Sequence, residues 1–328
     1  MFVLDSLRAL ADPTRLRIMR LLASMELAVG ELAQVLDQSQ PRVSRHVKIL
    51  CDAGLAERRR EGGWVFLRAA LGEARGAGVL PALANLLGQA EGADPAFGQQ
   101  CAQDRQHLDA IRTARDASAA EYFARHADEW DSLRSMHIAD GPVEEALAEM
   151  LAERAMDRGR AGLGRLLDVG TGTGRMAELF APSSSHVTAL DKSPDMLRLA
   201  RTRLQHLPAG HVTLVQGDFA KLPFAESSFD TVLFHQVMHY ALAPETMLAE
   251  AARVTAPGGR IAVVDFAAHD REELRASHAH ARLGFSDEQV ADMFGAAGFR
   301  LAADRALAGH QLIVKLWTGV REHGASIQ

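Results

Sequence analysis

The stretch Arg165-Leu-Leu-Asp-Val-Gly-Thr-Gly-Thr-Gly-Arg175 decides how the second half of this 328-residue chain folds. Its apolar run ending in Asp168 predicts a buried strand, and an amphipathic helix follows the glycines. Glycine has no Cβ, so the backbone can turn sharply and a ligand can approach closely. The spacing G-x-G-x-G differs from the G-x-G-x-x-G of dinucleotide sites. It therefore favours a nucleotide ligand with an adenosine but no pyrophosphate.

Strands and helices alternate from this stretch onward. We expect strands at 165–169, 186–190, 212–215, 231–234, 260–264, 300–304 and 311–317. We expect helices from 175, from 194, near 244–255 and over 286–297. This order predicts an α/β fold with a Rossmann-like, mostly parallel seven-stranded sheet and helices on both faces. A ligand then binds at the carboxyl ends of the strands.

Carboxylates stand at the ends of three successive strands. Asp168 ends the first, Asp191 the second and Asp218 the third. Asp191 can accept hydrogen bonds from both hydroxyls of a ribose, and Asp218 can receive an adenine amino group beside the flat side chain of Phe219. Three acids at one sheet edge, together with the glycine turn, favour a nucleoside site over scattered surface carboxylates.

The motifs LLDVGTGTG, ALDKSPDMLRLAR, VQGDFAKLPFAESSFDTVLFHQVMHY and AARVTAPGGRIAVVDF resemble those of the class I methyltransferases, over residues 140–320. The resemblance implies S-adenosylmethionine as cofactor. It implies that Asp168 and the glycines shape the methionine pocket, that Asp191 takes the ribose and that Asp218 with Phe219 takes the adenine. The cofactor-binding set is then Asp168, Gly170, Gly172, Gly174, Asp191, Asp218, Phe219 and His235.

The segment after the fourth strand bears on the methyl acceptor. It reads His235-Gln-Val-Met-His239-Tyr240 and lacks the Asn/Asp-Pro-Pro-aromatic loop of methyltransferases that act on DNA bases. We therefore expect a small-molecule acceptor, with His235 or His239 beside Tyr240 as general base on a hydroxyl, carbon acid or thiol of the acceptor. His235 and His239 are four residues apart, so a metal site with His278 or His280 is an alternative, but we assign no metal. The role of the cluster His235, His239, His269, His278 and His280 stays open.

The first eighty residues carry a different pattern. Asp12-Pro13 predicts the start of a helix. An apolar-periodic segment then precedes a turn at 37–39 and a second helix from Gln40, whose apolar stripe is Val43, Val47 and Leu50. Arg-rich strands at 55–60 and 64–68 flank Glu61-Gly-Gly63. This order predicts a helix-turn-helix followed by a β-hairpin wing.

The segment LADPTRLRIMRLL…VGELAQVL…SQPRVSRHVKILCDAGLAERRREGGWVFLR resembles the ArsR/SmtB family of winged-helix repressors. The resemblance implies a homodimer on an inverted-repeat operator of double-stranded DNA. The expected DNA-contacting residues are Gln40, Arg42, Ser44, Arg45, His46, Lys48, Arg59 and Arg60. Metal-sensing members carry cysteines where this chain has residues 27–30, LAVG, so a thiolate metal sensor is excluded.

We expect three parts: a winged helix at 1–75, a helical connector at 76–135 and the methyltransferase at 136–328. In the connector we expect a short apolar helix for dimerisation at 79–87 and a hinge at 92–98. A long helix should run from Gln99 to about Leu133, and its aromatic end packs on the next domain or covers the cofactor as a lid, with Tyr122 or Trp130 near the reactive group. Residues 1–75 carry a net charge of +3 and the remainder −9. The chain shows no membrane span and no signal peptide, which favours a cytoplasmic protein without membrane partners.

Two functions fit these features. In the first, an ArsR-type regulator is fused to an active methyltransferase that uses a small-molecule acceptor. In the second, the methyltransferase fold binds S-adenosylmethionine or S-adenosylhomocysteine as an effector only, and gates operator binding without catalysis, for instance at methionine-cycle genes.

Overall fold

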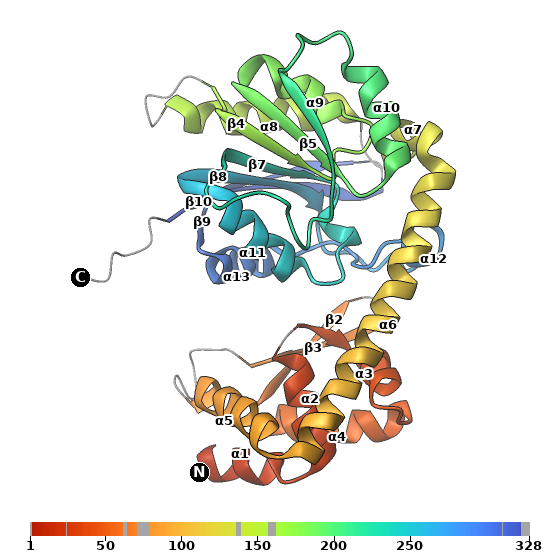
Figure 1. Cartoon of the computed structure of the whole chain (residues 1–328), viewed down its shortest axis with the longest axis vertical. Coiled ribbons are helices and arrows are strands. Elements are labelled where there is room, and N and C mark those ends of the chain that lie inside the picture. The colour runs from red at the N-terminus through yellow and green to blue at the C-terminus, as the bar shows by residue number, and fades with distance from the viewer. Residues whose placement is uncertain are drawn as a thin grey trace, which may run out of the picture. The chain divides into compact units, whose positions relative to one another are not determined.

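The computed structural model describes residues 2–23, 25–61, 64–70, 79–135, 139–156, 162–309 and 311–322 (Figure 1). Contacts divide the chain into two compact units, Met1–Ala117 and Ser118–Gln328. The division falls inside the predicted connector, 76–135, whose limits stay a prediction. Within the described ranges, no helix combines the length and apolar character needed to cross a bilayer.

The first unit contains the predicted helix-turn-helix. Its helices are α1 (Phe2–Leu10), α2 (Pro13–Leu22), α3 (Val29–Val35) and α4 (Gln40–Asp52). Asp12 caps α2, because its Oδ1 accepts a 3.2 Å hydrogen bond from the backbone N–H of Arg15. The apolar stripe of α4 is buried as expected, at Val43, Val47 and Leu50. Helix α1 was not predicted.

The wing is a three-stranded antiparallel sheet. Strands β2 (Ala56–Glu61) and β3 (Trp64–Ala69) pair from Ala56 opposite Ala69 to Glu61 opposite Trp64. Strand β1 (Leu27–Ala28) pairs with the other edge of β3. The predicted turn residues Gly62 and Gly63 lie outside the described residues.

The connector differs from its prediction. Helix α5 spans Val79–Ala93 and α6 spans Pro95–His126, so only Asp94 separates them where a hinge over 92–98 was expected. Asp94 Oδ1 accepts from the backbone N–H groups of Ala96 and Phe97, and Pro95 begins α6, so α6 starts at once. The chain then leaves α6 at His126 and continues as η1 (Ala127–Glu129) and α7 (Trp130–Ser135) instead of one helix to Leu133.

The second unit is built on the predicted seven-stranded sheet. Its strands are β4 (Arg165–Val169), β5 (His186–Asp191), β6 (Val212–Gln216), β7 (Phe229–His235), β8 (Thr255–Phe266), β9 (Phe299–Ala308) and β10 (Ile313–Arg321). They stand in the order β6-β5-β4-β7-β8-β10-β9. The first five are parallel, and β10 is antiparallel to both of its neighbours.

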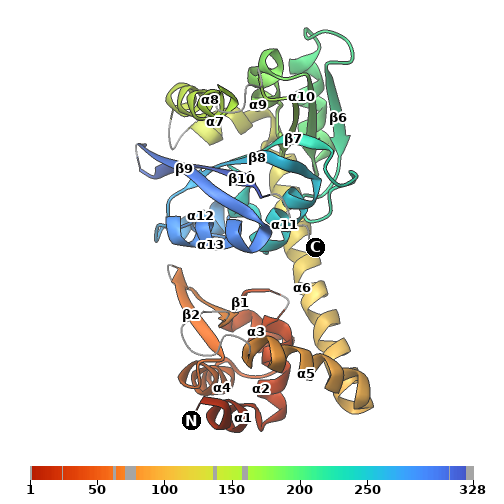
Figure 2. The ribbon, with the colours of Figure 1, turned by 90° about the vertical axis from the view of Figure 1, so that its left-hand side faces the viewer.

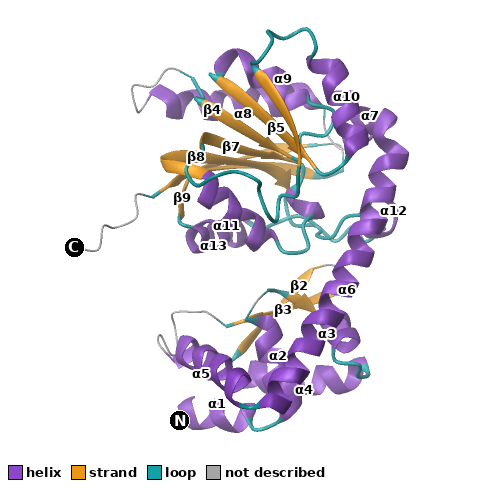
Figure 3. Ribbon diagram, viewed as in Figure 1, coloured by secondary structure: helices purple, strands orange, loops and turns teal. Residues whose placement is uncertain are grey.

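Helices cover both faces of this sheet (Figures 2 and 3). They are α8 (Asp140–Met156), α9 (Arg175–Phe180), α10 (Pro194–Leu204), α11 (Pro244–Val254), α12 (Glu273–Ser277) and α13 (Asp287–Ala297). Helices α8, α9 and α10 join one buried apolar cluster, and α11 and α13 join the other. Helix α8 and the full length of β8 were not predicted.

The strand order reverses at β4. The chain runs outward from β4 through β5 to β6, and then returns to β7 on the other side of β4. The loops after β4 and β7 therefore diverge at the carboxyl edge of the sheet, where open α/β sheets bind their ligands.

The capped start of α2 gives a test of the first unit. Replacing Asp12→Ala should lower the free energy of unfolding by about 1 kcal/mol, because the N–H of Arg15 loses its acceptor. Urea denaturation followed by circular dichroism measures the loss. Asp52→Ala, at the exposed last position of α4, is the matched control and should cost less. Equal losses for the two variants would contradict the capping role.

Candidate functional site

The glycine turn after β4 has a backbone that requires glycine. Gly170, Gly172 and Gly174 have φ values of +69°, +54° and +85°, a region that side chains disfavour. A Cβ added to Gly170 would lie 2.5 Å from Val237 Cγ2, and one on Gly174 would lie 3.1 Å from Ala200 Cβ. The turn is therefore fixed both by its own conformation and by its neighbours.

Two of the predicted carboxylates hold this turn. Asp168 is 1% exposed, and its Oδ2 accepts a 2.5 Å hydrogen bond from the hydroxyl of Thr171. Asp191 Oδ2 accepts from the backbone N–H of Gly172 at 2.8 Å, and its Oδ1 accepts from the N–H of Ser193 at 2.8 Å. Burial raises the pKa of Asp191, while the backbone N–H groups oppose the rise. With the backbone N–H of Lys192 as a third donor, the carboxylate still has acceptor capacity for a further donor such as a ribose hydroxyl.

The third carboxylate, Asp218, is partly exposed to solvent. Asp218 Oδ1 accepts from the backbone N–H of Ala220 at 2.8 Å, and Oδ2 lies 2.9 Å from Lys192 Nζ. Phe219 packs against the apolar cluster that contains α11 and α13. Sequence reasoning missed Lys192, although it directly follows Asp191 and so stands at the same edge.

On the other side of β4, the segment after β7 forms a buried acid–imidazole pair. His239 lies in η3 (Met238–Tyr240), and its Nδ1 is 2.7 Å from Asp265 Oδ1 near the end of β8. The backbone N–H of His239 donates to Asp265 Oδ2 at 3.1 Å. His239 and Asp265 are 2% and 0% exposed. The sequence predicted His239 but not its partner, although Asp265 stands near a strand end as the other site acids do.

The other predicted catalytic residues take different places. Tyr240 faces His239 at 4.0 Å between ring centroids, and burial raises its pKa well above the ordinary range, so its phenol stays protonated. His235 is 8% exposed at the end of β7. Because His235 ends a strand and His239 lies in a 3-10 turn, their spacing does not put them on one helical face. Among the described residues, no group of three or more His, Cys, Asp or Glu side chains is arranged to hold a metal.

A small aromatic chamber adjoins the pair. Its lining residues are Tyr122, Trp130, Leu133, Gln236, His239, Tyr240, Phe266, His278 and His280. Trp130 also lies over the glycine turn, since a Cβ on Gly172 would be 3.4 Å from Trp130 Nε1. The chamber therefore stands directly beside the predicted cofactor turn.

Tyr122, Trp130 and Leu133 form the roof of this chamber, and hydrogen bonds tie the segment that holds Trp130 to the glycine turn. Thr173 donates its hydroxyl hydrogen to Asp131 Oδ1 at 2.7 Å, and Arg203 of α10 bonds both Asp131 and Thr173. The sequence predicted that the aromatic end of the long helix, near Leu133, packs on the methyltransferase domain or forms a lid. Tyr122, Trp130 and Leu133 of that segment line the chamber, and the function of the segment as a lid stays a prediction.

Some of the side chains predicted to contact DNA are exposed, and others contact other residues of the protein. Gln40, Arg42, Arg45, Lys48 and Arg60 are exposed, and Ser44 is half-buried. His46 is also half-buried, with its Nδ1 3.6 Å from Asp12 Oδ1. Arg59 pairs with Glu26 at 2.7 Å and Glu61 at 3.2 Å, so it anchors the wing.

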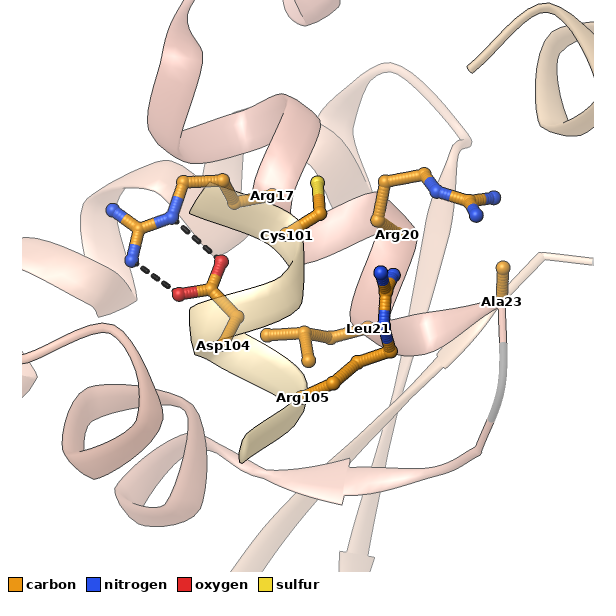
Figure 4. Close-up of a pocket in the computed structure, with 7 residues that line it drawn as sticks. All are labelled: Arg17, Arg20, Leu21, Ala23, Cys101, Asp104 and Arg105. Carbon is orange, nitrogen blue, oxygen red and sulfur yellow. Dashed lines mark hydrogen bonds and ion pairs between the residues drawn. The ribbon is translucent and has the colours of Figure 1, made fainter. Parts of the chain in front are cut away.

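Ion pairs fasten α2 to the helices that follow the wing (Figure 4). Arg17 binds both oxygens of Asp104, at 2.7 and 2.6 Å. Glu91 lies between Arg20 at 2.6 Å and Arg105 at 2.5 Å. Beside buried Cys101 these groups border a cavity of about 180 Å³. Each guanidinium there already has a carboxylate, so we interpret the cluster as a clamp between helices.

Comparisons with known proteins match both halves of the chain. Residues 12–58 match the family model described as bacterial regulatory protein, arsR family, and residues 167–263 match that of a methyltransferase domain. The chain thus joins an N-terminal ArsR-type helix-turn-helix to a C-terminal methyltransferase domain of class I fold, which supports S-adenosylmethionine as its cofactor.

Several curated proteins are similar to part of the chain. A demethylmenaquinone methyltransferase of Tropheryma whipplei (strain Twist) is 32% identical over 163 residues, 49% of this chain and 64% of that protein. A malonyl-[acyl-carrier protein] O-methyltransferase of Serratia marcescens is 32% identical over 49% of this chain and 58% of its own length. A phosphatidylethanolamine N-methyltransferase of Cereibacter sphaeroides is 34% identical over 42% and 65%. The chain thus spans less than two thirds of each relative.

Solved structures with a similar fold include methyltransferases. One is an S-adenosylmethionine-dependent methyltransferase from Mesorhizobium loti, with a TM-score of 0.46 and 17% identity, which covers 54% of this chain and 96% of that one. Another is an arsenic(III) S-adenosylmethionine methyltransferase from Chlamydomonas reinhardtii, with a TM-score of 0.42 and 22% identity over 51% and 66%.

The glycine turn predicts a selective loss of cofactor binding. Gly170→Ala puts a Cβ against Val237 at a positive φ, so we expect S-adenosylhomocysteine affinity to fall at least about tenfold, as a turn displacement costing more than 1.4 kcal/mol would cause. Titration calorimetry measures the affinity. Gly295→Ala, in α13 with open space around it, is the control and should bind normally. Normal binding by the Gly170 variant would refute the close fit of this turn.

Asp191 predicts a pH dependence. We expect its charged carboxylate to accept the ribose hydroxyls, and burial raises the pKa at which that charge is lost. Affinity for S-adenosylhomocysteine should therefore fall as the pH is lowered through the raised pKa of Asp191. Asp191→Asn should bind more weakly at neutral pH and show a flatter profile. Identical profiles for the two proteins would show that Asp191 does not govern the dependence.

Proposed function

We propose that the chain is a bifunctional protein, in which an ArsR-type DNA-binding regulator is fused to a methyltransferase that transfers the methyl group of S-adenosylmethionine to a small molecule. One observation carries the catalytic half. Trp130 lies over Gly172 of the cofactor turn and also lines the chamber that contains His239. Donor and acceptor sites are then neighbours, as direct group transfer requires.

The residues at the edge of the sheet fit the cofactor. The glycines of the turn have positive φ values and close neighbours, so the turn presents bare backbone where another residue would have a Cβ. The Asp191 carboxylate can accept further hydrogen bonds from hydroxyl donors. We assign Asp168 and the three glycines to the methionine part, Asp191 to the ribose, and Asp218 with Phe219 to the adenine. His235 belongs to the edge of this pocket. When bound, the cofactor supplies an already activated methyl group.

The acceptor side assigns roles to this chain's own groups. His239 is held by Asp265 and is proposed as the general base, and Tyr240 remains a protonated neighbour that shapes the site. The curated relatives are named for demethylmenaquinone, for O-methylation of a malonyl-acyl-carrier protein and for N-methylation of phosphatidylethanolamine. These names agree on methyl transfer and differ in the acceptor.

A sensor without catalysis is the alternative that the sequence allowed. Effector binding alone would need the cofactor pocket but not a buried acid–imidazole pair beside an adjoining chamber. We therefore favour catalysis. The regulator is proposed to act as a homodimer on an inverted-repeat operator in the cytoplasm, with Gln40, Arg42, Ser44, Arg45 and Lys48 toward the major groove.

Methyl transfer is tested by incubating the full chain and radiolabelled S-adenosylmethionine with a small-molecule extract of the source cells. We expect a labelled product that depends on the cofactor pocket and is lost in Asp191→Ala. Arg300→Ala, on an exposed part of β9, is the control and should retain activity. Binding of the cofactor without labelled product, together with a change in DNA affinity, would favour the sensor instead.

DNA binding is tested on operators selected from random double-stranded sequences. Replacing Arg45→Ala should weaken specific binding by about 1–3 kcal/mol, or reduce the salt dependence by about one contact if Arg45 meets a phosphate. Fluorescence anisotropy at several salt concentrations measures both effects, again with Arg300→Ala as control. An Arg45 variant that binds as tightly as the parent protein would place the DNA face elsewhere.

A further inference from the structure

We propose that the chamber beside His239 takes a neutral, flat acceptor with an acidic hydroxyl group, a phenol or an enol, and that Asp265 positions His239 to remove its proton. The proposal rests on the methyltransferase function above, since it names the acceptor class of that same site. Asp265 is here a positioning residue, because it acts on the acceptor only through His239.

The hydrogen bonds of Asp265 fix the imidazole. Its Oδ1 accepts from His239 Nδ1 at 2.7 Å and from the backbone N–H of Phe266 at 2.8 Å, and Oδ2 accepts from the backbone N–H of His239 at 3.1 Å. A carboxylate at this distance keeps the proton on Nδ1, so Nε2 carries the lone pair. Nε2 is buried and has no hydrogen-bond partner within the described part of the chain. A buried acceptor nitrogen at the chamber wall therefore suits an incoming O–H donor.

The walls select for a flat and uncharged molecule. Four of the lining side chains are aromatic: Tyr122, Trp130, Tyr240 and Phe266. Tyr240 meets the ring of Phe123 at 4.9 Å and that of Trp130 at 6.3 Å, so the aromatic wall continues behind the lining. Among the described lining residues there is no Lys, Arg, Asp or Glu. A cationic acceptor would lose its hydration here without a carboxylate in the lining, whereas an aromatic ring would gain contacts and its phenolate would face the protonated His239.

The proton and electrons balance on these groups. The acceptor hydroxyl gives its proton to His239 Nε2, and its oxygen forms a bond to the methyl carbon. The bond from that carbon to the sulfonium breaks, and its electron pair stays on sulfur. The Asp265 carboxylate stays hydrogen-bonded to the imidazolium, which later releases its proton to solvent.

An aromatic acceptor can enter the chamber only if the roof moves. Its cavity is about 30 Å³, which is room for roughly one or two waters and too little for an aromatic ring. Tyr122, Trp130 and Leu133 form the roof, and the segment that holds Trp130 is tied to the rest of the site through Asp131. Entry of an acceptor should thus change the surroundings of the Trp130 indole.

The test uses 4-nitrophenol, whose absorbance reports its own ionisation, with the full-length protein. We expect the bound probe to show its phenolate band at a pH where the free probe is mostly protonated. His239→Gln and Asp265→Asn should raise the apparent pKa of the bound probe by at least about one unit, a tenfold loss of phenolate at a given pH. His206→Gln, an exposed histidine that follows α10, is the matched control and should behave as the parent.

A charged analogue tests the acceptor class. Benzylamine should displace the probe at least about tenfold less well than neutral phenol, as a missing carboxylate partner worth more than 1.4 kcal/mol would cause. The proposal is overturned if the probe does not bind, if it ionises equally in His239→Gln, or if benzylamine competes as well as phenol. Should Asp265→Asn fail to fold by circular dichroism, His239→Gln decides alone.

Calorimetry with S-adenosylhomocysteine separates this proposal from the one beneath it. If the parent protein does not bind S-adenosylhomocysteine, the methyltransferase function fails. If it binds and the probe does not ionise, only the acceptor class and the role of Asp265 fail. Both variants should keep the parent affinity, because Asp265 and His239 lie outside the glycine turn.

Discussion

The close approach of Val237 to Gly170 is the contact on which the methyltransferase unit depends. A Cβ on Gly170 would lie 2.5 Å from Val237 Cγ2, so the absence of a side chain lets the segment after β7 pack directly on the turn after β4. Val237 stands between His235 and His239 in the chain. The same glycine therefore leaves backbone open toward the proposed cofactor and lets the segment with the candidate base pack beside it, because a Cβ at this position would meet Val237.

Buried carboxylates near strand ends then orient the polar parts of the site. Asp168 holds the hydroxyl of Thr171, Asp191 holds two backbone N–H groups, and Asp265 holds the imidazole of His239. In each case the hydrogen bonds fix the position of the carboxylate. Such preorganised groups need little rearrangement when a ligand arrives.

The DNA-binding unit uses its charges in two ways. Arg17, Arg20 and Arg105 form ion pairs with carboxylates, which join α2 to α5 and α6. Arg59 forms an ion pair that holds the wing. Arg42, Arg45 and Lys48 are exposed, and we propose them as contacts to DNA. The net charge of residues 1–75 therefore does not distinguish the basic groups that pair with carboxylates from those that are exposed.

Local patterns in the sequence determined the glycine turn, the Asp12 cap, the inward stripe of α4 and the order of strands and helices, because each depends on residues within a few positions of one another. The break at Asp94 shows where this failed, since composition predicted a flexible hinge and an Asx cap with Pro95 made a tight start. The tertiary structure alone decided which distant groups meet. Asp265 reaches His239 across 26 residues, Arg59 reaches Glu26 across 33, and Arg17 reaches Asp104 across 87. Those pairs follow from strand order and helix packing, which bring together residues that no sequence period relates.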